Sequence, residues 1–507
     1  MSDDTATPVC LTGHELTIDQ VERVARRGAH VELDRDAAVA MAAARQIVER
    51  YLADGRPAYG LTTGLGAKVV DRLPADALAE FSRQTVLGRA NSVGPPLPTE
   101  VVRAAMLVRA NGLARGGAGA RPELAQALVE LLERGVHPVV PSIGSVGAGD
   151  ICVLAHMGLV VIGEGEAELG GTVMQGGRAL TEAGLAPLEL APKDGLALIS
   201  SNAVSAAFAA LALVDGLAAL ETAQVAAALS MEGFRASLTP IDERVAAARP
   251  APGQATSAAA LRRLLAGGSL AASAEGRRLQ DPLSFRCVSQ VHGSLATALD
   301  LLRAALEPEL NGAGDNPLVL PEAGAIVSTG NFLVPALALA ADAVALALAQ
   351  VANLTAARVA RLLSEPLTGL PQNLAPAGST GAGMAPLLKV SDALAAEIVH
   401  GAAPATLATR VWASTVEDAD TGAPLATGRL SSLLARLRLL TALELVVAAQ
   451  AVDFAAVEAL GAGTGAAYAV VRELVEPFSA DRPLGADVER VAAELERVLE
   501  AATARRE

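Results

Sequence analysis

The chain is poor in aromatic residues and in cysteine. Its 507 residues include one Trp, three Tyr and seven Phe, together 2% of the total. A core with so few rings must be built from Ala, Leu and Val, a composition that favours closely packed helices. The three cysteines, Cys10, Cys152 and Cys287, lie far apart and form no CxxC pair. This count argues against a disulfide framework or a zinc site and indicates a reducing cytoplasm.

Clusters of basic residues are also missing. The chain has 40 Lys and Arg against 55 Asp and Glu, a net charge of −15, which argues against nucleic acid or an anionic membrane as a partner. The first ten residues, MSDDTATPVC, lack the basic and apolar parts of a secretion signal. We therefore expect a cytoplasmic protein.

Apolar residues make up 52% of the chain and the mean hydropathy is +0.39. The longest apolar runs are nevertheless interrupted by Asp215, Glu221, Asp342, Glu444 and Asp453, at intervals too short for a bilayer span. These runs predict helices buried in a large soluble bundle.

The predicted elements are almost all helical. Thr17 and Gln20 have the spacing of a capping box before a first helix. No repeat or linker marks a domain boundary, so we draw one soft division near residue 195, between regions 1–195 and 196–507. The expected helices cover 36–53, 75–87, 99–114, 122–135, 151–163, 197–232, 255–266, 288–307, 332–365, 386–400 and 429–461.

Four polar or glycine-rich segments separate these helices, at 59–66, 144–150, 280–293 and 309–317. Functional sites often lie in such connections. The segment 144–150 has glycines before a helix, as a phosphate-binding loop does, but it lacks the Gly-Lys-Ser/Thr of a Walker motif. Arg286, in the third segment, suits a bidentate grip on a carboxylate. From this segment alone, an arginine that ties two helices together is an equally good interpretation.

Taken together, the segments resemble the aromatic amino acid ammonia-lyase family, which includes histidine, phenylalanine and tyrosine ammonia-lyases and aminomutases. The resemblance spans almost the whole chain, through LTIDQVERVARRG, NGLARGGAG, GVHPVVPS, KDGLALI, ELNGAGDNPLV and GLPQNL. It implies a mainly α fold, a long-helix bundle that assembles as a homotetramer with active sites shared between subunits. The implied partner is a small amino-acid-like substrate, and no metal is implied.

The sequence departs from the family at the segment that makes its electrophile. Family members cyclise an Ala-Ser-Gly tripeptide to a methylidene-imidazolone, whereas this chain reads Ala148-Gly149-Asp150 with the serine deleted. Because that serine supplies the methylidene carbon, we expect that the group does not form and that the protein uses no cofactor.

Three further positions differ around the same pocket. Ser200 stands where the family has an Asn that contacts the electrophile, and Leu283 stands where it has a Tyr. Arg89 aligns with a position that often carries a His and helps to choose the substrate side chain. Arg89 therefore suggests an anionic or strongly polar substrate side chain.

Other positions match the family. Tyr59 aligns with its general base, Arg286 with its carboxylate-binding arginine and Glu417 with its pocket glutamate, so we assign these three as catalytic. Tyr59 also has a structural interpretation, as a packed loop tyrosine. Lys389 is an unexpected charge in an apolar segment, either a pocket residue or a helix-surface lysine. The remaining predicted pocket residues are Asn311 and Phe332.

Without the electrophile, elimination needs either a leaving group that is already good or a proton that is already acidic. The resemblance therefore favours a carbon–nitrogen lyase of an ergothionase-like variety, which eliminates an amine, such as a quaternary one from a betaine, to give an α,β-unsaturated acid. Three alternatives stay open at this point: an ordinary ammonia-lyase for histidine or an aromatic amino acid, an enzyme of conjugate addition, and an inactive scaffold.

Overall fold

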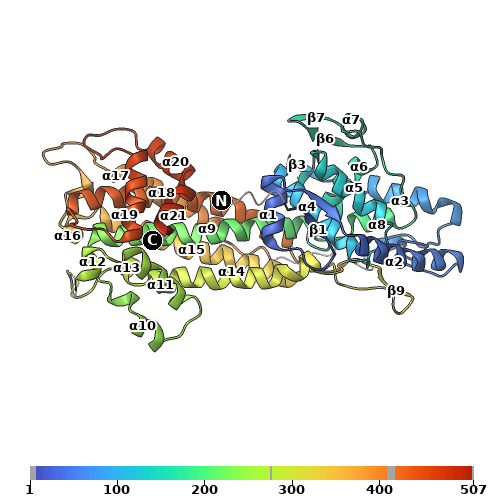
Figure 1. Ribbon diagram of the computed structural model, residues 1–507, viewed down its shortest axis with the longest axis horizontal. Coiled ribbons are helices and arrows are strands. Elements are labelled where there is room, and N and C mark those ends of the chain that lie inside the picture. Colours follow the sequence, from blue (N-terminus) through green and yellow to red (C-terminus); the bar gives the residue numbers. More distant parts are fainter. Residues whose placement is uncertain (1–6, 274–276, 408–416, 505–507) are drawn as a thin grey trace. The chain divides into compact units, whose positions relative to one another are not determined.

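The computed structural model describes residues 7–273, 277–407 and 417–504, and it is mainly helical, as predicted (Figure 1). The chain forms two compact units, each made of three stretches of sequence: 1–214, 302–341 and 405–428 in the first, and 215–301, 342–404 and 429–507 in the second. This division differs from the one expected near residue 195. Four of its five boundaries fall inside the four longest helices and the fifth, between 404 and 405, follows α17, so no single point of the sequence separates the units. These helices are α9 (Ala203–Phe234), α14 (Val288–Asn311), α15 (Pro335–Leu362) and α18 (Ala423–Ala455).

In its described residues the first unit contains eight further α-helices and all the named strands. Its strands form short ladders only: β1 pairs with β2 in parallel, while β3–β5, β4–β6–β7 and β8–β9 are antiparallel. The helices are α1 (Ile18–Arg27), α2 (Arg35–Ala53), α3 (Leu78–Leu87), α4 (Thr99–Ala114), α5 (Pro122–Glu133), α6 (Ile151–Val161), α7 (Gly176–Glu182) and α8 (Asp194–Ile199). The strands are β1 (Val9–Leu11), β2 (Val31–Leu33), β3 (Val93–Pro96), β4 (Val136–Pro138), β5 (Pro141–Ile143), β6 (Glu166–Leu169), β7 (Thr172–Gln175), β8 (Leu318–Leu320) and β9 (Ala325–Val327).

The capping box predicted at the start of α1 is confirmed. The Thr17 side chain accepts a hydrogen bond from the Gln20 backbone N–H, and the Gln20 side chain accepts one from the Thr17 N–H. This reciprocal pair satisfies two N–H groups that the first turn of a helix leaves free.

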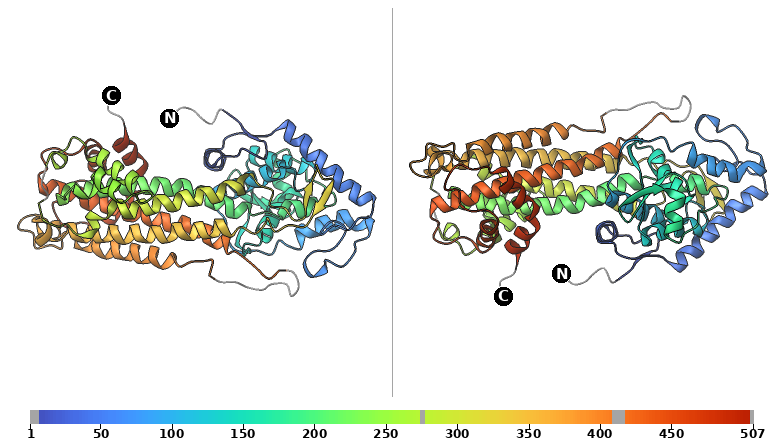
Figure 2. Two further views of the ribbon diagram at one scale, coloured as in Figure 1. Left: turned by 90° about the horizontal axis from the view of Figure 1, so that it is seen from below. Right: turned by 90° about the horizontal axis from the view of Figure 1, so that it is seen from above.

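In the second unit, the long helices run side by side (Figure 2) and shorter helices pack around them. Small residues allow the close approach that the composition predicted: a methyl group on Gly233 of α9 would lie 2.8 Å from the Ala451 Cβ of α18. The other helices are α10 (Glu243–Ala248), α11 (Gln254–Leu265), α12 (Ser269–Ala272), α13 (Leu283–Arg286), α16 (Glu365–Thr368), α17 (Ala385–Gly401), α19 (Ala462–Leu474), α20 (Gly485–Ala493) and α21 (Leu495–Thr503).

Two stretches, 194–234 and 335–362, are long and apolar enough to cross a membrane by length and composition. In each, 67% of the most apolar window is buried inside the structure, as expected of core helices in a packed bundle.

A fully buried ion pair joins two of the long helices within the second unit. Arg358 of α15 donates from Nε to Glu444 Oε1 of α18 at 2.6 Å and from Nη2 to Oε2 at 2.9 Å, and both side chains are 0% exposed. Arg358 Nη1 also donates to the Ser284 carbonyl of α13 at 3.4 Å. Burial and the Arg358 charge lower the pKa of His292 to about 3, so His292 is neutral in this core.

Glu444→Gln tests how far the second unit depends on this pair. The substitution leaves the Arg358 cation buried without a counter-ion, and we expect the free energy of unfolding to fall by about 3–5 kcal/mol in urea denaturation. The double variant Arg358→Met/Glu444→Leu removes both charges of the pair and should recover most of that loss. A loss below about 1 kcal/mol in the single variant would contradict this account.

Candidate active site

The loop 144–150 is anchored by one buried carboxylate. Asp150 is 0% exposed; its Oδ2 accepts from the Ser205 N–H at 2.8 Å, and its Oδ1 lies 3.1 Å from Ser205 Oγ and 2.9 Å from Ser145 Oγ. Burial raises the pKa of Asp150, and these hydrogen bonds oppose the rise. Asp150 thus fixes the end of the loop to the first turn of α9.

Close contacts fix the rest of the loop. Gly147 has φ +89°, and a Cβ there would lie 2.2 Å from Thr421 Oγ1, which donates to the Gly147 carbonyl at 2.8 Å. Ala148 forms an antiparallel bridge with Leu333. Gly149 has φ +77°, and its carbonyl lies 3.1 Å from Ser145 Oγ. Only glycine adopts these positive φ values at little cost, so the loop geometry is specified by sequence.

Tyr59, Arg89 and Glu417, three residues predicted to share a pocket, share one neighbourhood of the first unit. Tyr59 Oη accepts from the Gly66 N–H at 2.9 Å, and a methyl group on Gly66 would lie 3.5 Å from Glu417 Oε1. Burial lowers the pKa of Arg89, while Tyr59, Cys152 and Glu417 oppose this by attraction. The cluster therefore combines a phenol, a guanidinium, a thiol and a carboxylate.

Cys152 and His156 lie in the same region and were not predicted as site residues. Burial raises the pKa of the Cys152 thiol, Arg89 lowers it and Glu417 raises it further. His156, one turn along α6, accepts from the Ser92 N–H at Nε2 over 3.2 Å, and burial lowers its pKa. The sequence shows that Cys152 and His156 follow the loop and stand four residues apart, which places them on one face of α6. It does not show that this face lies near Arg89.

Ser200 and Phe332 each directly precede a residue whose backbone contacts the loop, Ser201 and Leu333 respectively. Ser200 ends α8 and is 6% exposed, and the next residue, Ser201, accepts from the Asp150 N–H at 2.6 Å. Asn202 Nδ2 donates to the Phe332 carbonyl at 2.8 Å, and its buried Oδ1 has no partner in the described part of the chain. Sequence reasoning did not single out Asn202.

The Asn311 side chain is engaged elsewhere. Its Oδ1 accepts from the Leu16 N–H at 2.8 Å and its Nδ2 donates to the Leu16 carbonyl at 3.0 Å. These bonds tie α14 to the segment before α1. A pocket role for Asn311 stays a prediction.

Arg286, Leu283 and Lys389 belong to the second unit. Leu283 is 63% exposed, and Arg286 is half-buried with no side-chain hydrogen bond or ion pair to any described residue. Lys389 is exposed on α17. A free guanidinium suits a carboxylate ligand. That these three residues share an active site with the Tyr59 cluster stays a prediction.

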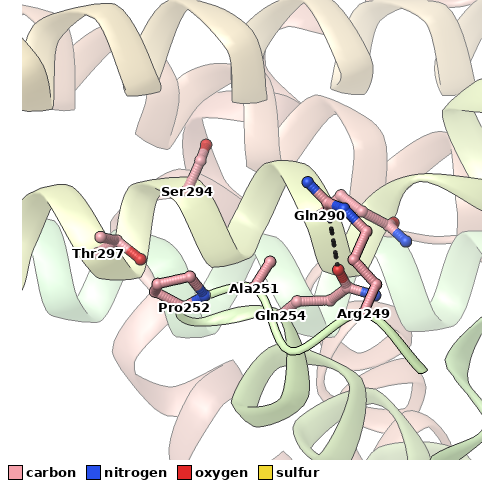
Figure 3. Close-up of a pocket in the computed structure, with 7 residues that line it drawn as sticks. All are labelled: Arg249, Ala251, Pro252, Gln254, Gln290, Ser294 and Thr297. Atoms are coloured by element: carbon pink, nitrogen blue, oxygen red, sulfur yellow. Dashed lines mark hydrogen bonds between the residues drawn. The ribbon is translucent and has the colours of Figure 1, made fainter. Parts of the chain in front are cut away.

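Hollows outside the Tyr59 cluster contain other polar groups. A cavity of about 240 Å³ in the first unit is lined by Arg109, Asn202, Glu309 and Asn331, among others. The second unit has a hollow of about 310 Å³. Arg249 Nη1 donates to Gln254 Oε1 at 3.2 Å in its lining (Figure 3). The lining includes Gln290 of the segment 280–293 but none of the predicted site residues. Within the described ranges, no group of three or more His, Cys, Asp or Glu is placed to hold a metal ion.

A model of the family "Aromatic amino acid lyase" matches residues 16–473. The chain belongs to this family. It is 39% identical to histidine ammonia-lyase of Symbiobacterium thermophilum over 481 residues, 95% of each chain. It is 40% identical to histidine ammonia-lyase of Anaeromyxobacter sp. (strain K) over 494 residues, 95% of this chain and 97% of the relative.

Solved structures agree with the predicted fold. Ergothionase from Treponema denticola, in complex with desmethyl-ergothioneine sulfonic acid, superposes with a TM-score of 0.93 at 31% identity, covering 97% of this chain and 99% of that one. Tyrosine aminomutase from Streptomyces globisporus gives 0.92 at 30% identity, with 98% of both chains covered. The predicted family and long-helix fold are confirmed, and the protein is a carbon–nitrogen lyase.

The carboxyl group of Glu309 predicts a pH effect on stability. Burial raises its pKa from an ordinary 4.5 to about 7, so the folded chain binds this proton more tightly than the unfolded chain and stability falls as pH rises through that window. Glu309→Gln removes this loss. We compare the free energy of unfolding of the variant and of the native chain by urea denaturation. We expect the difference between them to grow in favour of the variant by about 2 kcal/mol from pH 5.5 to pH 8. The matched control is Glu307→Gln, an exposed position on the same helix; an equal gain there would contradict the assignment.

Proposed function

We propose that this lyase eliminates a quaternary amine from a betaine-type amino acid without a methylidene-imidazolone group. The observation that carries the proposal is the loop itself. The chain has no serine between Ala148 and Gly149, and the loop's one serine, Ser145, is held at hydrogen-bond distance from the Gly149 carbonyl and Asp150. No residue is in place to supply the methylidene carbon, so the residues present do not fit the family's electrophile.

A quaternary ammonium suits such a site for a chemical reason. Its nitrogen has no lone pair and no N–H, so it cannot form a bond to an electrophile. It also needs no such activation, because it already leaves as a neutral amine. In the proposed step the Cβ–H bond breaks and its electron pair forms the Cα=Cβ bond. The electron pair of the Cα–N bond departs with the amine.

The Tyr59 cluster supports the base role. The phenolate of Tyr59 would take the β-proton at Oη, and the Gly66 N–H that already donates to this oxygen stabilises its negative charge. The Arg89 cation also stabilises a negative charge on Tyr59, and the Glu417 carboxylate would attract the substrate cation. Arg286 is proposed to bind the substrate carboxylate.

Ordinary histidine ammonia-lyase activity is the second candidate, because the curated relatives at 39–40% identity carry that name. It requires the electrophile, whose formation removes two water molecules from the chain. Intact mass spectrometry of the purified protein therefore separates the candidates. We expect the full mass calculated from the sequence.

The direct assay is proton NMR of the protein with ergothioneine, histidine betaine, histidine, phenylalanine and tyrosine. We expect free trimethylamine and vinyl protons from a betaine and no ammonia from the plain amino acids. Tyr59→Phe should lower the rate by about 10²-fold or more, whereas Tyr468→Phe, a tyrosine of the second unit, should leave it within about twofold. Ammonia from histidine would overturn the proposal, and conversion of an unsaturated acid with added amine would indicate conjugate addition instead.

We further propose a cytoplasmic homotetramer with shared active sites. On α15, Leu339 and Leu346 are 58% and 48% exposed, and their spacing of seven residues places them on one face of the helix. An apolar face of this kind suits contact with a second copy.

Mixing two inactive variants tests the shared site. If Tyr59 and Arg286 of one site come from different chains, refolding Tyr59→Phe with Arg286→Ala in equal amounts should restore about a quarter of the native activity. Each variant refolded alone is the control. Absence of any recovery in tetramers shown to be mixed would place both residues of each site on one chain.

A further inference from the structure

A large cavity in the second unit has no part in the proposed reaction. Its volume is about 860 Å³, and it lies among the end of α9, the segment 235–242, α11, α12 and the residues that follow α18. Its lining includes Arg235, Arg244, Arg262 and Arg277, with the hydroxyl residues Ser237 and Ser269. Arginine and hydroxyl groups together are typical of oxyanion sites.

Two of these guanidinium groups converge on one uncharged atom. Arg235 Nη2 donates to the Thr368 carbonyl at 2.6 Å, and Arg277 Nη1 donates to the same oxygen. Arg277 Nη2 donates to the Leu367 carbonyl at 3.0 Å. A carbonyl orients a guanidinium but does not neutralise it, so both positive charges remain.

A third guanidinium, Arg278, lies in the same group. Burial is the main cause that lowers the pKa of Arg235 and of Arg277, and neighbouring cations lower both further. Arg278 acts on Arg235, and both Arg235 and Arg278 act on Arg277. Among the described residues, Asp281 is the one carboxylate that opposes these effects, and its Oδ1 lies 3.5 Å from Arg278 Nη1. Three cations against one described carboxylate leave this cluster with a surplus of two positive charges.

The guanidinium groups of Arg235 and Arg278 are not saturated by hydrogen bonds. The buried atoms Arg235 Nε and Arg278 Nη1 and Nη2 have no hydrogen-bond partner among the described residues. The arginines elsewhere in the lining are engaged: Arg244 is paired with Asp242 at 2.7 Å, and Arg262 donates to the Ile241 carbonyl at 2.6 Å.

The acidic residues of the lining do not neutralise the cluster. Asp242 is the partner of Arg244, and Glu458 is exposed. Glu232 Oε1 accepts from the Gly461 N–H at 2.9 Å and from Thr464 Oγ1 at 3.0 Å, and burial raises its pKa.

We propose that this cavity is a second ligand site, which binds a small organic dianion, a phosphate monoester or a dicarboxylate, through Arg235 and Arg277 of its lining, with the nearby Arg278 adding its charge. Two positive charges that no described carboxylate neutralises match a dianion, and planar guanidinium groups match its oxygens. The volume exceeds that of a bare phosphate and leaves room for an organic group.

Aromatic contacts connect the arginine cluster to the segment that carries Arg286. The Arg278 guanidinium lies 4.6 Å from the centre of the Phe234 ring, and that ring stacks on Phe285 with 4.0 Å between centroids. Phe285 directly precedes Arg286 in α13. Arg278 thus connects the charge cluster of the cavity to the aromatic pair next to the predicted carboxylate-binding arginine.

Binding is measurable without any substrate, so the test does not depend on the proposed reaction. We would titrate the full chain by calorimetry at low ionic strength with glycerol 3-phosphate, inorganic phosphate and succinate. We expect one site per chain with a dissociation constant of about 1 mM or tighter for at least one probe. A phosphate ester that binds more tightly than succinate assigns the phosphate class, and the reverse order assigns the dicarboxylate class.

Substitutions locate the site. Arg235→Gln and Arg277→Gln should each weaken binding about tenfold or more, whereas Arg178→Gln, an exposed arginine of the first unit paired with Glu182, should leave it within about twofold. If Arg235→Gln fails to fold, the exposed Arg277 decides. Absence of binding at about 10 mM of every probe would overturn the proposal. So would binding that survives Arg277→Gln and is lost in Arg286→Gln, because the anion would then occupy the substrate-carboxylate position.

Discussion

The candidate site depends on the buried carboxylate of Asp150. A fully buried acid is costly unless its oxygens are hydrogen-bonded, and Asp150 meets that condition with the Ser205 N–H, the Ser205 hydroxyl and the Ser145 hydroxyl. These bonds link three elements: the loop, the first turn of α6 and the first turn of α9. Oδ1 is shared between the loop hydroxyl of Ser145 and the helix hydroxyl of Ser205, and Oδ2 is held by the Ser205 N–H, so the loop position and the helix positions are fixed together.

This anchoring separates the shape of the loop from its chemistry. Gly147 and Gly149 keep positive φ values and Ala148 keeps its bridge to Leu333, although the serine that the family cyclises is absent. A loop kept only for the electrophile would have no need of these constraints once the serine is lost. Here the same contacts order the Ser201–Asn202 turn and the Phe332 backbone, so the frame would keep a use in the proposed site, which has no prosthetic group.

Much of the fold and part of the site could be predicted because the signals are local. The capping box needs only Thr17 and Gln20, and the helices follow an apolar pattern with glycine-rich breaks. The two units could not be predicted, because four of their five boundaries lie inside helices and depend on which helix ends pack together. Likewise, Cys152 and His156 were missed since their relevance comes from Arg89 and Ser92, which approach them only in the folded chain.

The charge balance of the proposed reaction suits the Tyr59 cluster. A phenolate at Tyr59 and the substrate ammonium are opposite charges that disappear in the same step, as the phenol regains its proton and a neutral amine departs. Burial lowers the pKa of Arg89 and raises that of Cys152, which shows that the surroundings disfavour charge. A step that removes a pair of charges is accelerated by such surroundings, because the separated charges of the ground state are less stabilised there than in water. Arg89 and Glu417 are not consumed in the step, and their opposite charges balance each other after the amine has left.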